Sequence, residues 1–185
     1  KFRRFAGEGS HVAPDLLKRD FTAAAPNEKW VTDVTEFSVG KRKLYLSPIM
    51  DLYNGEIVAF DTSEAPVLGM VENMLSRAFE RLGPHDRPIV HSDQGWQYRM
   101  SKYHRHLERR CLSQSMSRKG NCLDNAAMES FFGTLKCEFF YLNAFDSIEQ
   151  LADGIQHYIR YYNEDRIKAR LKTSPVSFRL REAAL

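Results

Sequence analysis

The sequence predicts an α/β fold in which a five-stranded mixed sheet, three antiparallel strands followed by two parallel ones, is flanked by helices. Three runs rich in Val, Ile, Thr, Tyr and Phe follow one another between residues 30 and 63. Helical and strand-like segments then alternate up to residue 116. The 185 residues, 43% of them hydrophobic, suffice for one substantial core.

The three N-terminal strands are expected at residues 30–39, 43–53 and 56–63. Asn54 and Gly55 stand between the second and the third strand, and this pair favours a two-residue hairpin turn because both residues accept a positive φ. The three strands should therefore form an antiparallel meander.

A helical crossover is expected next. Apolar residues recur at helical spacing from 67 to 82, and residues 88–92 predict a short buried strand. A helix at 101–110 and a strand near 111–116 follow. A strand, a helix and a further strand imply parallel pairing, so the sheet should be mixed.

The remaining part of the chain is predicted to be helical and then basic. One helix is expected from Asp124, a suitable N-cap, to Phe139, and another from 147 to 163. The Ser174-Pro175 pair is expected to break the tail that follows.

Three segments describe the domain organisation that we expect. Residues 1–29 form a basic N-terminal arm or linker, 30–163 the core, and 164–185 a basic C-terminal tail that packs on the core or extends from it. Because the chain begins with Lys in basic, loop-like sequence, we expect that further residues precede it.

Composition excludes several classes of protein. No stretch approaches the ~20 apolar residues of a membrane span, and no apolar secretion signal is present, so a soluble, cytoplasmic protein without a membrane partner is expected. The three cysteines occur singly, which argues against a structural zinc and against a disulfide framework. Basic residues gather at 99–119 and 160–181, as phosphate-facing surfaces or as ordinary solvated helix faces.

Three carboxylates stand at positions of functional interest. Asp33 interrupts a strand in which Asp is disfavoured and burial is expected. Asp93 follows directly after a strand, where α/β proteins carry functional loops, although a turn or a helix cap explains it as well. Glu129 lies on a polar helix stripe, where a simply solvated Glu is the alternative.

Carboxylates of this kind can hold hard divalent cations. Mg²⁺ prefers oxygen ligands and keeps waters, so a few acids and substrate phosphates suffice. Two such ions about 4 Å apart can activate the attacking oxygen and stabilise the leaving one in phosphoryl transfer. Spacing alone does not select three of the 24 acids, and the others that remain eligible are Glu36, Asp51, Asp61 and Asp124.

The context of these acids resembles a known family. The segments 30–37 (WVTDVTEF), 91–95 (HSDQG) and 120–132 (GNCLDNAAMESFF) are similar to the three acidic motifs of the DDE transposases of bacterial insertion sequences, in the insertion sequence 3 family and its 150-like subgroup. The 35 residues between Asp93 and Glu129 match the spacing of the integrase-like group. The segment 161–166 (YYNEDR), with Leu171 and Ser174-Pro175 behind it, resembles the closing motif of that family.

The resemblance implies a ribonuclease-H-like fold and a retroviral-integrase-like catalytic core. It implies that Asp33, Asp93 and Glu129 are both the catalytic residues and the metal ligands, with two Mg²⁺ ions for which Mn²⁺ can substitute. The reaction would be nicking of element ends to free 3′-OH groups, followed by strand transfer. Double-stranded DNA would be the partner, bound by a homo-oligomer in the bacterial nucleoid.

Roles in DNA binding are expected for four neighbours. Lys136, Arg118 and Lys119 can hold DNA phosphates, with a solvated loop as the alternative for the latter two. Asn125 can orient Glu129, contact DNA or only bond the adjoining loop. The aromatic residues at 96, 98 and 103 either stack on a splayed base or pack in the core, and packing is favoured.

Competing hypotheses remain open. The element His106-Leu107-Glu108-Arg109 matches the H-x-x-R pattern of tyrosine recombinases, whose covalent mechanism needs no metal. A ribonuclease-H-like nuclease would hydrolyse DNA without strand transfer, and an inactive relic would only bind it. No helix-turn-helix or zinc module is evident, so recognition of the element ends is expected upstream.

Overall fold

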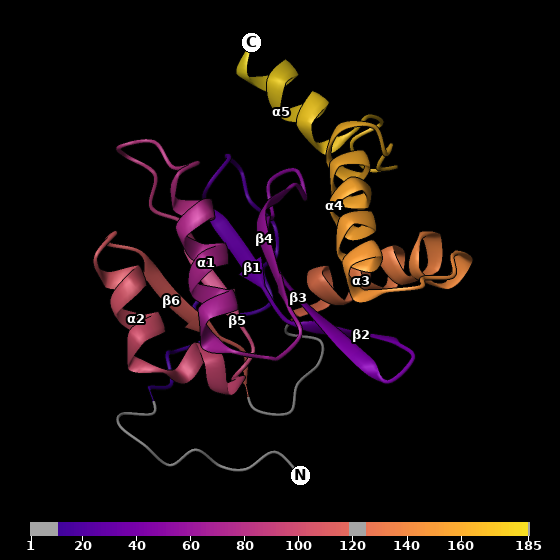
Figure 1. Cartoon of the computed structure of the whole chain (residues 1–185). Coiled ribbons are helices and arrows are strands. Elements are labelled where there is room, and N and C mark those ends of the chain that lie inside the picture. Colours follow the sequence, from indigo (N-terminus) through magenta and orange to yellow (C-terminus); the bar gives the residue numbers. More distant parts are fainter. Residues whose placement is uncertain (1–10, 119–124, 185) are drawn as a thin grey trace.

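The computed structural model describes residues 11–118 and 125–184, which form a mixed sheet between two layers of helices (Figure 1). The strands are β1 (Lys29–Thr32), β2 (Thr35–Val39), β3 (Arg42–Asp51), β4 (Ile57–Ser63), β5 (Ile89–Ser92) and β6 (Ser113–Met116). The helices are α1 (Leu68–Phe79), α2 (Ser101–Glu108), α3 (Ala126–Glu138), α4 (Ile148–Glu164) and α5 (Pro175–Ala183), with short 3-10 helices η1 (Trp96–Arg99) and η3 (Phe140–Leu142). The predicted α/β class is confirmed.

The first predicted strand is present but interrupted. Both β1 and β2 pair antiparallel with β3, in one register that runs from Trp30 opposite Asp51 to Val39 opposite Arg42. The break falls at Asp33 and Val34, where the Asp33 Oδ1 accepts a hydrogen bond from the N–H of Val34 at 2.7 Å. The side chain of Asp33 thus binds the backbone N–H of Val34 at the point where the first expected strand is divided into β1 and β2. The sheet therefore has six strands instead of the expected five.

The hairpin between β3 and β4 is antiparallel as predicted, but the two-residue turn is wrong. The N–H of Gly55 donates to the carbonyl of Asp51 at 2.7 Å, so the connection is a longer loop. Gly55 has a φ of 73°, whereas Asn54 is fully buried and its amide donates to the carbonyl of Pro175 at 2.9 Å. Asn54 thus anchors the C-terminal segment.

The second half of the sheet is parallel, as expected. β5 pairs with β1 and β6 pairs with β5, so the sheet runs from the edge strand β4 through β3, β1 and β5 to β6. Because β1, β5 and β6 are parallel, their carboxyl ends meet at one edge of the sheet.

Successive residues of each strand point to opposite faces and so form two cores. Trp30 and Ile49 face α1 and α2, whereas Val31 and Met50 face α3 and α4. Helix residues in the first core are Val71, Met74, Leu75, Tyr103 and Leu107, and those in the second are Met128, Phe131, Leu135, Leu151, Ile155 and Ile159. The helices hold the sheet rigid from both sides.

The C-terminal segment contains a helix where a break was expected. Ser174 is the N-cap of α5, since its hydroxyl accepts from the N–H of Ser177 at 3.4 Å, and Pro175 begins the helix. The predicted N-cap Asp124 lies outside the described residues. Ahead of β1, Leu17 is buried in the core beside α3 and α4, and the proposed division into arm, core and tail stays a prediction. None of the described helices is long and apolar enough to span a membrane.

Candidate active site

Two of the candidate acids follow neighbouring parallel strands. Asp33 comes directly after β1 and Asp93 directly after β5. The parallel register sets Val31 opposite His91, two residues ahead of Asp33 and of Asp93, and the charge of Asp93 acts on Asp33. Arg118 lies just past β6, the next strand in the sheet. The carboxyl edge of the parallel strands therefore brings two carboxylates together.

The environment of Asp33 opposes its ionisation. Burial raises the pKa of Asp33 from 3.8 to about 7, helped by the nearby charge of Asp93 and, more weakly, by that of Glu129. The hydrogen bond from the N–H of Val34 acts in the opposite direction and is outweighed. The charge of Glu129 is the smallest of these influences on Asp33.

Asp93 is oriented by a tight turn. Its Oδ1 accepts a hydrogen bond from the N–H of Gly95 at 2.7 Å, so the turn considered as an alternative role for Asp93 does form. A Cβ at position 95 would lie 2.8 Å from the same oxygen, closer than real Cβ contacts. The glycine therefore lets the Asp93 carboxylate keep its place, and its position two residues after the acid was a signal available in the sequence.

Glu129 lies on a helix that covers the sheet and not on a strand. It lies in the first turn of α3, is exposed, and is carried by a helix whose opposite face packs Met128 and Phe131 in the core. The three candidate acids thus come from two strand ends of the sheet and from one helix that covers it.

The donor set fits a hard divalent cation. In both aspartates Oδ1 accepts a backbone N–H, which orients the carboxylate. Three carboxylates offer only oxygen donors, which suit Mg²⁺ or Mn²⁺ better than zinc. Within 11–118 and 125–184, no group of three His, Cys, Asp or Glu side chains lies close enough together to hold a metal ion.

The other eligible acids have different partners. Glu36 is paired with Lys43 at 2.6 Å, and Asp61 lies 3.3 Å from Arg77. Asp51 is paired with Arg179 at the opposite end of the sheet, because β3 runs antiparallel to β1. Asp124 lies outside the described residues.

The expected DNA-contacting residues are dispersed. Lys136 lies over the ring of Phe37, with Nζ 5.4 Å from its centroid, two helical turns beyond Glu129. Arg118 is exposed beside the carboxyl edge, and Lys119 lies outside the described residues. Asn125 is only 5% exposed, so its side chain does not face solvent.

Packing explains most of the remaining candidate side chains. Tyr98 and Tyr103 are buried, as favoured, whereas Trp96 is 41% exposed. Of the H-x-x-R element, His106 lies on α2 with its Nε2 3.3 Å from Glu72. The imidazole of His91 is buried and its Nδ1 lies 2.8 Å from the hydroxyl of Ser115, as a structural strand residue would.

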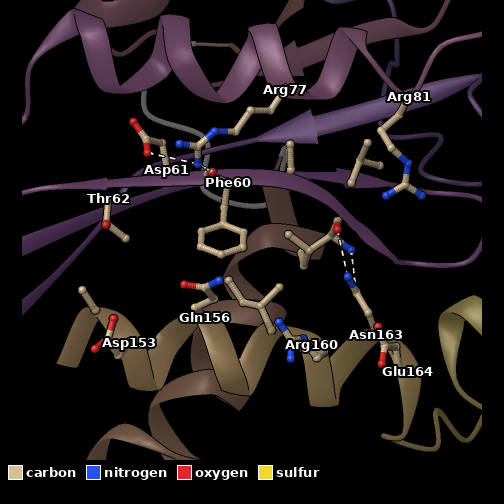
Figure 2. A pocket seen from close by; sticks show the side chains of 15 residues that line it. Phe60, Asp61, Thr62, Arg77, Arg81, Asp153, Gln156, Arg160, Asn163 and Glu164 are labelled. Atoms are coloured by element: carbon tan, nitrogen blue, oxygen red, sulfur yellow. Dashed lines mark hydrogen bonds and ion pairs between the residues drawn. The ribbon is translucent and has the colours of Figure 1, made fainter. Parts of the chain in front are cut away.

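A separate cavity of about 710 Å³ lies along the edge strand β4, between α1 and α4. Figure 2 shows Phe60 pointing from β4 toward α4, with Asp61 and Arg77 on the α1 side. Asn163 covers part of the strand edge, exchanging hydrogen bonds of 2.8 and 2.9 Å with the backbone of Ile57. None of the three candidate acids lines this cavity, so it is not the site described above.

The strand order, the helical crossover and the acids at the carboxyl edge define a ribonuclease-H-like core. Solved structures agree: a chain of the simian T-cell lymphotropic virus intasome, in complex with a PP2A regulatory subunit, matches 92% of this chain and 58% of its own length with a TM-score of 0.72 at 16% identity. The HTLV-2 integrase catalytic core domain, in complex with magnesium, matches 85% of this chain and 99% of its own length with a TM-score of 0.65 at 14% identity. The fold is thereby confirmed as that of integrase cores.

Sequence relatives identify the family. Models described as integrase core domains match residues 23–122 and 129–182. The chain is 56% identical over 180 residues to a putative transposase for the insertion sequence element IS150 of Escherichia coli, covering 97% of this chain and 64% of the relative. It is 53% identical to a transposase-like protein of Haemophilus influenzae, covering 97% of this chain and 83% of that protein. The chain belongs to the integrase core family, among the transposases of insertion sequence 3 type.

Proposed function

We propose that this chain is the catalytic core of a DNA transposase that nicks the ends of its element and transfers the freed strands. The observation that carries this proposal is the position of Asp33 at the end of β1, where burial raises its pKa and the charges of Asp93 and, more weakly, Glu129 raise it further. A partly buried carboxylate with like charges nearby is costly unless a cation compensates it. Membership of the integrase core family supports the same function. The chain spans 64% of the length of the Escherichia coli relative, so the activity of the whole protein is part of the proposal.

In this proposal Asp33, Asp93 and Glu129 hold two Mg²⁺ ions, for which Mn²⁺ can substitute. Bound there, the cations would supply the charge that activates an attacking oxygen and stabilises a leaving one. The chain's own part is positioning: Val34 and Gly95 orient two of the carboxylates through their N–H groups. Lys136, Arg118 and Lys119 hold phosphates of the DNA on either side.

The bonds exchanged are the same in both steps of the reaction. In nicking, the oxygen of a water forms a bond to phosphorus, and the bond from phosphorus to the 3′ oxygen breaks, which frees a 3′-OH at the element end. In strand transfer, that 3′-OH forms the new bond to a target phosphorus and displaces the 3′ oxygen of the target strand. Asp33, which keeps a proton more readily than an ordinary Asp, must lose it before it can hold a cation.

The partners of the proposed enzyme are double-stranded DNA of the element ends and of the target. A homo-oligomer assembled on DNA would bring two ends together, in the cytoplasm and at the nucleoid.

The test is cleavage and strand transfer on a labelled native end, with Mg²⁺, with Mn²⁺ and with EDTA. We expect both products only with metal, and a loss on the order of 10³-fold or more for Asp33→Asn, Asp93→Asn and Glu129→Gln. DNA binding by these variants should stay near that of the wild type. Asp61→Asn, an acid whose partner is Arg77, is the matched control and should keep activity.

Other outcomes identify the alternatives. Activity in EDTA would indicate a covalent tyrosine mechanism, and cleavage without joined products would indicate a nuclease. DNA binding without any cleavage would indicate a relic. Full activity of Asp93→Asn would overturn the assignment of the acids.

A further inference from the structure

The start of α3 carries a buried amide whose role the reaction chemistry leaves open. Asn125 is the N-cap residue of α3, one turn ahead of Glu129, and its side chain is only 5% exposed. It makes no capping hydrogen bond to its own helix. A side chain so enclosed is not placed to contact a DNA phosphate, so the amide serves something within the protein.

The amide of Asn125 reaches across to the sheet. Its Nδ2 donates a hydrogen bond of 3.3 Å to the carbonyl of Thr32, the residue directly ahead of Asp33. Thr32 is itself held firmly, since its hydroxyl donates to the carbonyl of Pro48 at 2.8 Å and its backbone pairs with Ile49. The bond therefore joins the helix that carries one candidate acid to the strand that carries another, across 93 residues of sequence.

The rest of α3 is anchored by contacts of a different kind. Met128, Phe131 and Leu135 pack in the core, and such apolar contacts have no preferred direction. A hydrogen bond does have one, and a helix is nearly rigid over the single turn from Asn125 to Glu129. Fixing the amide on Thr32 thus fixes the distance from the Glu129 backbone to Asp33.

The Oδ1 of Asn125 is buried and has no hydrogen-bond partner among the described residues.

We propose that Asn125 is a positioning residue, which sets Glu129 against Asp33 so that the carboxylates can share a divalent cation. The inference rests on the proposed function, because it concerns the same edge. Asn125 acts through Glu129 and touches neither the DNA nor the reacting atoms.

The experiment compares Asn125→Ala with Asn163→Ala as a matched control. Asn163 also binds a strand backbone through its amide, at Ile57 on the edge strand β4. For both variants and the wild type, Mn²⁺ binding to the DNA-free chain is measured by calorimetry, the Mg²⁺ requirement of nicking by titration, and stability by urea unfolding.

For Asn125→Ala we expect Mn²⁺ binding about tenfold weaker or more, and a Mg²⁺ concentration for half-maximal nicking raised by a similar factor, as for other supporting residues of metal sites. Nicking should recover in part at high Mg²⁺. Asn163→Ala should lose stability to at least the same extent and keep the metal dependence of the wild type. Should the alanine variant not fold, Asn125→Leu, similar in shape and without a donor, carries the same expectation.

Two results would overturn the proposal. One is wild-type Mn²⁺ binding and Mg²⁺ requirement in a folded Asn125 variant. The other is a change in metal dependence that Asn163→Ala shows equally. A wild-type chain that neither binds Mn²⁺ nor cleaves DNA would overturn both the proposed function and the positioning role. A metal-dependent wild type together with an unaffected Asn125 variant would overturn only the positioning role of Asn125.

Discussion

The two ends of the sheet carry carboxylates that are at least partly buried, Asp51 and Glu56 fully at one end and Asp33 partly at the other, but in opposite surroundings. At one end Asp51 and Glu56, which flank the loop between β3 and β4, share Arg179 from α5. At the other end Asp33 lies near the charges of Asp93 and Glu129. Burial is common to both ends, so burial alone does not indicate function. A buried carboxylate beside a positive side chain has a structural role, whereas one beside other carboxylates is a candidate ligand of a cation.

The structural end has many compensating contacts. Burial raises the pKa of Asp51, and this is opposed by the N–H groups of Asn27 and Tyr53, at 2.9 and 3.0 Å, and by Arg179. Glu56 also binds Arg81 at 2.7 Å. At Asp33, burial and the neighbouring acids raise the pKa. The hydrogen bond from the N–H of Val34 lowers it, but by less. The contacts around Asp51 and Glu56 stabilise the fold. The surroundings of Asp33 lower the stability of the protein when no cation is bound.

Removing the shared arginine should produce the largest change in stability. Arg179→Ala leaves Asp51 and Glu56 buried without their common cation, and we expect the free energy of unfolding to fall by about 3–5 kcal/mol in urea titrations. Metal dependence should be unchanged, because this end lies away from the candidate acids. Arg181→Ala, which removes an exposed arginine from the same helix, is the control and should change stability by less than about 0.5 kcal/mol. A loss below about 1 kcal/mol for Arg179→Ala would contradict the structural role of this end.

Removing the charge at Asp33 should stabilise the metal-free protein while it abolishes activity. Folding raises the pKa of Asp33 from 3.8 to about 7, so the folded chain holds this proton more tightly than the unfolded chain. Its contribution to stability is therefore present at low pH and is lost as the pH rises from about 4 to about 7. At pH 8 we expect Asp33→Asn to be more stable than the wild type by on the order of 3 kcal/mol.

The measurement is the difference in unfolding free energy between wild type and Asp33→Asn from pH 4 to pH 8, without metal. That difference should grow steadily with pH, and saturating Mg²⁺ should reduce it because the cation binds only the folded wild type. A difference that does not depend on pH would mean that Asp33 is an ordinary surface acid.

A single methyl group at the turn after β5 should weaken metal binding with little effect on stability. In Gly95→Ala the new Cβ collides with the Oδ1 of Asp93, so the carboxylate must turn away. We expect about tenfold weaker Mn²⁺ binding and nicking, in line with changes around other metal ligands. Gly69→Ala is the control, since a Cβ there meets open space at the start of α1, and it should stabilise by up to about 1 kcal/mol. Equal metal binding in both variants would contradict the role of Gly95.

Much of the fold was predictable because the patterns that encode it are local. The helix near 67–82, the buried strand at 88–92 and the parallel crossover all appear within a few residues of their expected bounds. The break at Asp33 was visible only as an oddity within a strand, because the hydrogen bond to Val34 that forms it depends on one side-chain conformation. The helix α5 was missed, although Ser174 and Pro175 are an ordinary N-cap and first residue.

The sequence by itself determined which segments form strands and helices, which face of each is apolar, that Asp33 interrupts a strand pattern, and that Asp93 directly follows a strand. These follow from periodicity over a few residues. Only the tertiary structure decided that Glu129 raises the pKa of Asp33, that Asn125 binds Thr32, and that Arg179 joins Asp51 to Glu56. Charge interactions and hydrogen bonds depend on distances of a few ångströms between segments far apart in the chain, and no local pattern encodes those distances.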